Sequence, residues 1–139
     1  MDDNLRREII MEHYQNPLNR HEVNDNSYVK ANTRNSSCID NLDIYVKIEN
    51  NIIKDIAFNG EACAISISST SIMIENLIGK TKEEALEYIE NFENMVNEKE
   101  YDSTLLKDAT VYSDIYKQNS RKTCATLPYR GIKEAILKA

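Results

Sequence analysis

The chain has 139 residues, of which 41% are hydrophobic and 29% charged, with only 3 Gly and 2 Pro. These values predict one globular domain spanning residues 1–139 and exclude disordered, collagen-like and low-complexity classes. The net charge of -6 excludes a general nucleic-acid binder, because phosphate recognition requires a basic face. The apolar runs are far shorter than the ~20 residues that cross a bilayer, and the N-terminal residues are too charged for a signal peptide. We therefore expect no membrane association and a cytoplasmic location.

The N-terminal half predicts a helix followed by a small antiparallel sheet. Apolar residues at helical spacing predict a helix over residues 3–15, followed by a polar loop. Alternating apolar and polar residues over 42–49 predict a half-buried strand, and residues 52–59 have the length of its hairpin partner. Residues 28–33 are expected to add a third strand.

The C-terminal half predicts a series of helices. A serine-rich apolar segment predicts a buried helix that stops at Gly79. Thr81 and Glu84 have the spacing of a capping box, which predicts the start of the next helix. Residues 100–120 suggest one or two short helical pieces, and the last helix is expected to start at Cys124. This order predicts an α+β fold, in which about three antiparallel strands are covered by helices.

Three cysteines are the strongest candidates for chemistry. Cys38, Cys63 and Cys124 are odd in number, which argues against a disulfide framework. Cys38 and Asp40 are two residues apart, so in extended backbone they project to the same face, away from Ile39, and the hairpin should bring Cys63 beside them. Cys124 is expected at a helix N-terminus near cationic residues, a position that lowers the pKa of a thiol. From spacing alone, three such cysteines are more often small core residues than ligands.

Other polar residues carry weaker signals. Residues 117–139 have a net charge of +5, whereas residues 1–116 have a net charge of -11, so the C-terminal stretch is predicted to be a basic island. His13 and His21 are expected to be packed or surface residues and not metal ligands. The serines of residues 66–71 lack any nucleophile motif and are expected to pack within a helix.

Four motifs in this order resemble the SufU type of the IscU/NifU-like family of iron–sulfur cluster assembly proteins. They are residues 10–19 (IMEHYQNPLN), Cys38-Ile39-Asp40, residues 59–66 (NGEACAIS) and residues 121–127 (RKTCATL). The resemblance covers nearly the whole chain. Two further features point to the SufU branch: the long stretch between Cys63 and Cys124, and Thr123 in the place where IscU scaffolds carry a histidine.

The resemblance implies a SufE/NifU-like sandwich fold and a bound zinc ion. The implied zinc ligands are Cys38, Asp40, Cys63 and Cys124, which would complete a tetrahedral shell. The implied activity is sulfur transfer: Cys38 accepts persulfide sulfur from a SufS-type cysteine desulfurase, and Arg121 stabilises the freed thiolate. Nearby basic residues would offset the negative charge of the site. As partners we expect the desulfurase and downstream iron–sulfur assembly proteins, with the chain itself a monomer or weak homodimer.

Two alternatives to sulfur transfer remain. The first is a scaffold that assembles a transient iron–sulfur cluster on the same ligands; Thr123 and the long insertion disfavour it. The second is a zinc-stabilised module that regulates the desulfurase by contact alone. Its motivation is that Ile39 and Ala62 stand where the family usually has Gly, so the backbone is less permissive and ligand exchange is expected to be slower.

Overall fold

The computed structural model describes residues 1–36 and 39–139. Within these ranges a three-stranded antiparallel sheet has the order β1-β2-β3, formed by Val29–Arg34, Asn41–Glu49 and Ile52–Glu61. Five α-helices are described over the same ranges: α1 (Asp3–Gln15), α2 (Ala64–Leu77), α3 (Lys82–Val96), α4 (Ser103–Leu106) and α5 (Asn119–Lys138). Two 3-10 helices, η1 (Lys107–Tyr112) and η2 (Ile115–Lys117), connect α4 to α5.

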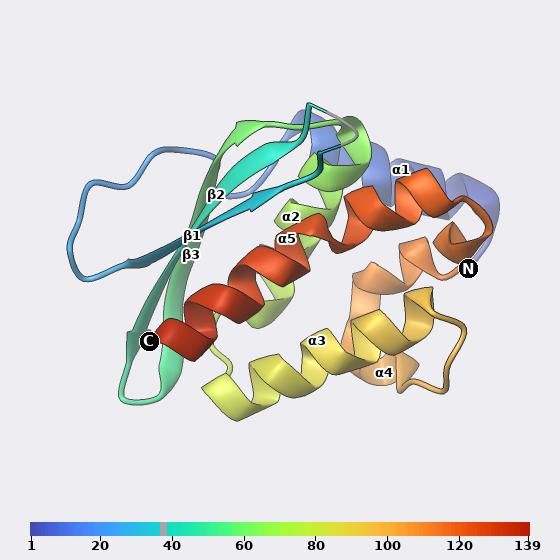
Figure 1. The fold of residues 1–139 in the computed structure, drawn as a ribbon. Helices are drawn as coiled ribbons and strands as arrows, with labels where there is room; N and C mark the ends of the chain where they lie inside the picture. The colour runs from blue at the N-terminus through green and yellow to red at the C-terminus, as the bar shows by residue number, and fades with distance from the viewer. Residues whose placement is uncertain (37–38) are drawn as a thin grey trace.

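The helices lie on one side of the sheet, with α5 running diagonally across β1 and β2 and α2 beside it (Figure 1). Strand residues such as Ile44 and Phe58 and helix residues such as Ile72 and Ile132 are fully buried between these layers. Removing this apolar surface from water is the main driving force of the fold. The predicted α+β architecture is confirmed. In the described part of the chain, no helix is long and apolar enough to cross a membrane.

The strand register brings three chain segments to one end of the sheet. The β2–β3 hairpin turns at Asn50 and Asn51, which both have positive φ, as a tight hairpin turn requires. Its pairing places Asn41 at the start of β2 opposite Glu61 at the end of β3. On the other side, Asn41 pairs with Arg34 at the end of β1. The residues that flank these positions therefore lie close together.

Local signals set the boundary between α2 and α3 as predicted. Gly79 follows α2 with a φ of 94°, the left-handed conformation that ends a helix. Thr81 Oγ1 accepts a hydrogen bond from the Glu84 amide at 3.1 Å, and Glu84 Oε1 accepts one from the Thr81 amide at 2.9 Å. This capping box satisfies backbone donors in the first turn of α3.

The predicted start of the last helix is wrong. α5 begins at Asn119 and not at Cys124, because its first turn is polar and exposed and so shows no apolar periodicity. Cys124 therefore lies in the second turn of α5, where the charge of the helix dipole has largely fallen off. Residues 100–120 are helical as predicted, but they form three short pieces, α4, η1 and η2, where one or two were expected.

Candidate metal centre

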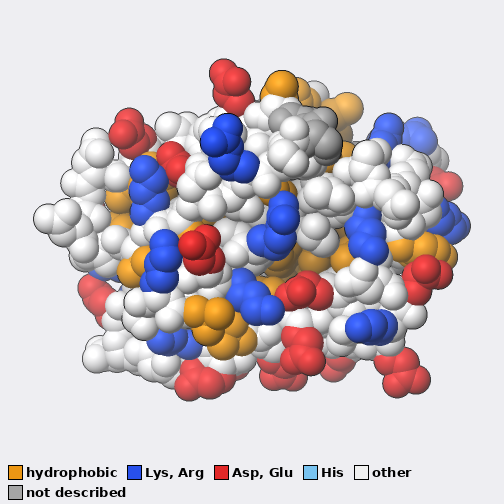
Figure 2. Space-filling view, in the orientation of Figure 1, with side chains coloured by type: hydrophobic (Ala, Val, Ile, Leu, Met, Phe, Trp, Pro, Cys, Tyr) orange, Lys and Arg blue, Asp and Glu red, His pale blue; other side chains and the backbone are white. Residues whose placement is uncertain are grey.

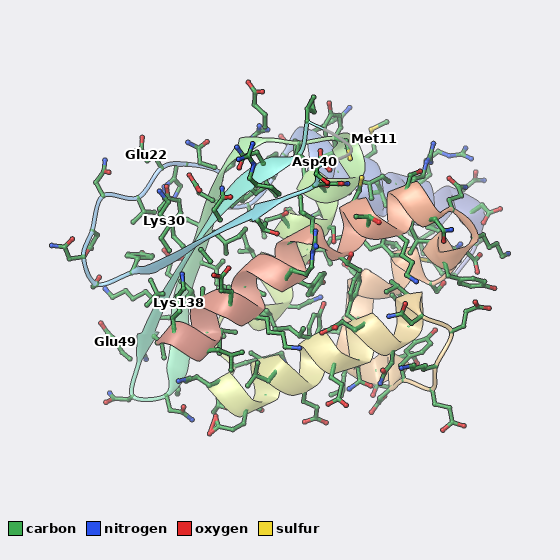
Figure 3. All side chains as sticks on the ribbon, in the orientation of Figure 1. Met11, Glu22, Lys30, Asp40, Glu49 and Lys138 are labelled. Atoms are coloured by element: carbon green, nitrogen blue, oxygen red, sulfur yellow. The ribbon has the colours of Figure 1, made fainter. Side chains whose placement is uncertain are left out.

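Three of the four expected ligands meet at the end of the sheet where β2 begins. Asp40 directly precedes β2, Cys63 lies between β3 and α2, and Cys124 belongs to α5. One ligand atom from each residue lies within 4.8 Å of the other two. Figure 3 shows Asp40 where the end of the sheet meets α2 and α5. The fourth expected ligand, Cys38, lies outside the described residues.

Backbone hydrogen bonds hold Asp40 and Cys63 against each other. The Cys63 amide donates to Asp40 Oδ1 at 2.7 Å, while the Cys63 carbonyl accepts from the Ile67 amide at 3.0 Å as α2 begins. The Asn35 amide donates to the Asp40 carbonyl at 3.0 Å. Ile39 is 71% exposed whereas Asp40 is 1% exposed, so these two side chains project to opposite sides, as predicted.

The Asp40 carboxylate is fully buried and is held through both oxygens. Besides the Cys63 amide on Oδ1, the Ser66 hydroxyl donates to Oδ2 at 2.7 Å. Cys63 Sγ lies 3.7 Å from the same Oδ2. A buried carboxylate is tolerated only with such charge-assisted partners, and here they aim it at the thiols.

The pKa of the Cys124 thiol is shifted in the direction opposite to the prediction. Burial raises it to about 12, assisted by hydrogen bonds with Cys63 and Asp40 and by their negative charge. The prediction of a lowered pKa assumed that Cys124 lies at a helix N-terminus, and it does not. Without a metal ion the thiol is therefore protonated at neutral pH, and a bound cation would have to displace that proton.

The basic residues of 117–139 are spread over the end of η2 and the length of α5, whose 20 residues span ~30 Å. Lys133 pairs with Glu93 and Lys138 with Glu134, each at 3.5 Å. Figure 2 shows basic and acidic side chains interspersed over the face that carries α5. The positive charge of this stretch is therefore distributed along the helix, and Lys133 and Lys138 are compensated locally.

Two hollows border the site. The larger, of about 820 Å³, is polar and is lined by Asn41, Gly60 and Asp40. The smaller, of about 510 Å³, lies between α1 and the first turns of α2 and α5. Arg121 lines it together with Ala64, the residue after Cys63. Arg121 thus lies on the same side of the molecule as the candidate ligands.

Ser66 is the site residue that sequence reasoning missed. The serines of α2 were expected to pack, and Ser69 does so by donating to the Ala125 carbonyl of α5 at 2.6 Å. Ser66 instead contacts Asp40 and lies 3.6 Å from Cys63 Sγ. The signal was available, because residues three apart at the start of a helix share a face.

The donor set of Asp40, Cys63 and Cys124 fits a zinc ion. Thiolate sulfur and carboxylate oxygen are both zinc ligands, and structural zinc sites use four donors in a tetrahedron. The three described donors converge in a buried setting with hydrogen bonds already placed around the carboxylate. Cys38, the fourth expected ligand, precedes Asp40 by two residues in the sequence.

Comparison with known proteins gives a consistent result. The family of NifU-like N-terminal domains matches residues 5–125. The chain is 36% identical over 137 residues to the zinc-dependent sulfurtransferase SufU of Bacillus subtilis, which covers 98% of this chain and 92% of that protein. It is 37% identical over 114 residues to the iron–sulfur cluster assembly scaffold protein IscU of Thermotoga maritima, covering 82% of this chain and 80% of that protein.

A solved structure has the same fold. The crystal structure of a SufU described as an iron–sulfur cluster assembly scaffold protein for the SUF system, from Fervidobacterium islandicum AW-1, superposes with a TM-score of 0.88. The two chains are 35% identical, and the match covers 93% of this chain and 94% of the other. The sheet and helices described above are therefore arranged as in that protein.

Proposed function

This chain belongs to the NifU-like N-terminal domain family, and from that premise we propose that it is a zinc-dependent sulfurtransferase of iron–sulfur cluster biogenesis. The observation that carries the proposal is the convergence of Asp40, Cys63 and Cys124 within 4.8 Å. The partner would be a cysteine desulfurase that presents a persulfide, and the sulfur would then pass to downstream iron–sulfur assembly proteins.

Cys38 is the proposed sulfur acceptor. Its thiolate would attack the terminal sulfur of the desulfurase persulfide, forming a new S–S bond at Cys38. The S–S bond of the desulfurase breaks in the same step, and the desulfurase cysteine leaves as a thiolate, so neither electrons nor protons are left over. The chain position supports this role, since Cys38 precedes the site residue Asp40 by two residues and Ile39 between them faces solvent.

The remaining site residues are proposed to bind the zinc ion and to stabilise the thiolate of the sulfur acceptor. Asp40, Cys63 and Cys124 would hold a zinc ion together with Cys38, and the bound ion would keep the thiol ligands deprotonated at neutral pH. Cys63 and Cys124 are proposed to remain ligands, because Cys63 directly precedes α2 and Cys124 lies within α5, and these two helices pack on each other. Arg121 is proposed to stabilise the negative charge of the Cys38 thiolate, supported by its place beside Ala64 in the smaller hollow.

The scaffold function is the second candidate, and its support is the similarity to the IscU of Thermotoga maritima. Thr123 weighs against it. IscU scaffolds carry a histidine at the position that Thr123 occupies here. The Thr123 hydroxyl donates to the Asn119 carbonyl of its own helix at 3.1 Å. A hydroxyl bonded within α5 contributes no further nitrogen donor to a cluster.

The test is to mix the purified protein with a cysteine desulfurase and cysteine, and to locate added sulfur by mass spectrometry. We expect about one zinc per chain, no visible absorption and one added sulfur atom at Cys38. Cys38→Ala should abolish the addition. Ser36→Ala, a change in the same segment, serves as the control and should leave the addition intact.

Other outcomes of this experiment would support one of the alternative roles of the protein. If Cys38→Ala still stimulates the desulfurase as strongly as wild type, the protein regulates by contact and transfer is excluded. Brown protein that contains iron and sulfide would indicate the scaffold. If the purified protein binds no metal, the cysteines are small residues that pack in the core and not metal ligands.

A further inference from the structure

The hydroxyl of Ser66 has two acceptors within reach but only one proton to donate. Asp40 Oδ2 lies 2.7 Å from Ser66 Oγ, and the Cys124 carbonyl oxygen lies 3.0 Å from it. Ser66 is fully buried, so water does not compete for this proton. The shorter distance and the negative charge make Asp40 the preferred acceptor while no cation neutralises it.

Pro128 explains why the second acceptor exists. In α5 the carbonyl of Cys124 would normally accept the amide hydrogen of the residue four positions later, which is Pro128. Proline has no amide hydrogen, so this helical bond cannot form. The Cys124 carbonyl is therefore an acceptor beside the site, and the Ser66 hydroxyl points at it.

We propose that Ser66 is a positioning residue of the metal centre, and that its hydroxyl alternates between the Asp40 carboxylate and the Cys124 carbonyl. Donation to Asp40 holds the carboxylate toward the two thiols. A carboxylate oxygen has two lone pairs, so Asp40 Oδ2 can keep this hydrogen bond while a cation is bound. The hydroxyl turns to the Cys124 carbonyl only when the carboxylate moves away, so the buried hydroxyl has an acceptor in both states.

This inference rests on the proposed zinc centre and deepens it, since it concerns how firmly one ligand is held. Partners that orient a metal ligand typically change metal affinity by about 10- to 100-fold when removed. Ser66 is the side-chain partner of Asp40 Oδ2 on α2, so its removal should fall in that range.

Ser69 provides a matched control on the same helix. Both serines are fully buried, and both direct their hydroxyls at carbonyls of α5, Cys124 for one and Ala125 for the other. Ser66→Ala and Ser69→Ala therefore remove the same group from similar surroundings. Only the first change touches Asp40.

The experiment compares wild type, Ser66→Ala and Ser69→Ala in zinc competition against a chromogenic chelator, and in the visible spectrum after cobalt substitution. We expect Ser66→Ala to weaken zinc binding by about 10- to 100-fold and to shift the cobalt bands. Ser69→Ala should match wild type in both readouts. A purely structural loss would lower the melting temperature of both variants while leaving the cobalt spectrum unchanged.

Two results would overturn the inference, and they are distinguishable. If wild type binds zinc and Ser66→Ala behaves as Ser69→Ala does, the role of Ser66 is wrong while the proposed function stands. If wild type binds neither zinc nor cobalt, the proposed metal centre itself is wrong. Should the alanine variant fail to fold, Ser66→Gly with Ser69→Gly as its control removes the same hydroxyls.

Discussion

At the scale of single residues, Gly60 shows how strongly the site end of the sheet constrains the chain. It lies at the end of β3, two residues after Phe58, and adopts a φ of 129°. A Cβ at this position would collide with the backbone carbonyl oxygen of Asn41 on the adjacent strand β2. The approach of β2 to β3 just before Cys63 therefore depends on the absence of a side chain.

Gly60→Ala should destabilise the protein more than Gly79→Ala. Gly79 also has a positive φ, of 94°, but a Cβ there would meet nothing within 4 Å. We expect a loss of about 1 kcal/mol in the free energy of unfolding for Gly79→Ala, from backbone strain alone. Gly60→Ala adds a backbone collision and should cost about 3 kcal/mol or more. Equal losses in urea unfolding would contradict this account.

Cys124 shows, also at the scale of single residues, why the sequence predicted the wrong direction for a pKa shift. Cys124 lies together with Asp40 and Cys63, yet the direction of its pKa shift was predicted wrongly. The helix dipole and cationic neighbours were expected to lower the pKa, because both were inferred from position along the chain. Burial beside Cys63 and Asp40 raises the pKa, and this burial arises only in the folded protein. Desolvation is the largest cause of the shift, and it cannot be read from neighbours in sequence.

At the scale of elements, α1 packs on the core only through part-buried residues such as Ile9 and Ile10, because none of its residues is fully buried. A polar cluster ties it to α2: His13 Nδ1 lies 2.7 Å from Ser71 Oγ, and His13 Nε2 lies 3.5 Å from Glu75 Oε2. At its other end, Arg6 pairs with Asp114 at 2.8 Å. The Arg6 guanidinium also lowers the pKa of Asp114.

His13→Ala should loosen α1 without unfolding the protein. Losing a part-buried hydrogen bond costs about 1 kcal/mol, which is small beside the stability of a domain. We expect faster hydrogen exchange of the α1 amides with unchanged protection in β2 and β3. His21→Ala, in an exposed loop, is the control and should leave α1 protected. Faster exchange throughout the sheet would show that His13 supports the whole core.

At the scale of the whole molecule, the core joins helices that are far apart in sequence through a cluster of aromatic rings. Phe92 of α3 stacks on Tyr129 of α5 with ring centroids 3.9 Å apart, and Tyr88 and Tyr112 lie beside this pair. All four side chains are buried. Burial raises the pKa of Tyr88 to about 12 and raises those of Tyr112 and Tyr129 further above the usual range.

Stability should therefore fall between pH 10 and pH 12. A folded-state pKa above the unfolded value of about 10 means that the folded state binds more protons in this window. The contribution of these tyrosines is complete below pH 10 and is lost as the pH rises. The check is urea unfolding at pH 9, 10 and 11, followed by tyrosinate absorbance. An unfolding free energy that stays constant up to pH 11 would rule this out.

Much of the architecture follows from short-range patterns along the chain. The alternation of residues 42–49, the capping box at Thr81 and Glu84, and the stop at Gly79 act within a few residues, so the sequence alone predicted these elements. The start of α5 was misplaced because its exposed first turn carries no apolar pattern. Strand β1 begins one residue later than predicted, since pairing with β2 sets its limits.

By itself the sequence determined the fold class, the family and the residue types of the metal centre, because periodicity and motifs are properties of neighbours in the chain. Only the tertiary structure decided that Asp40 is held by Ser66, that the Cys124 thiol is desolvated, and that the basic residues of α5 are dispersed. These features depend on distances between segments far apart in sequence. Burial and hydrogen bonding across such distances exist only after the layers have packed.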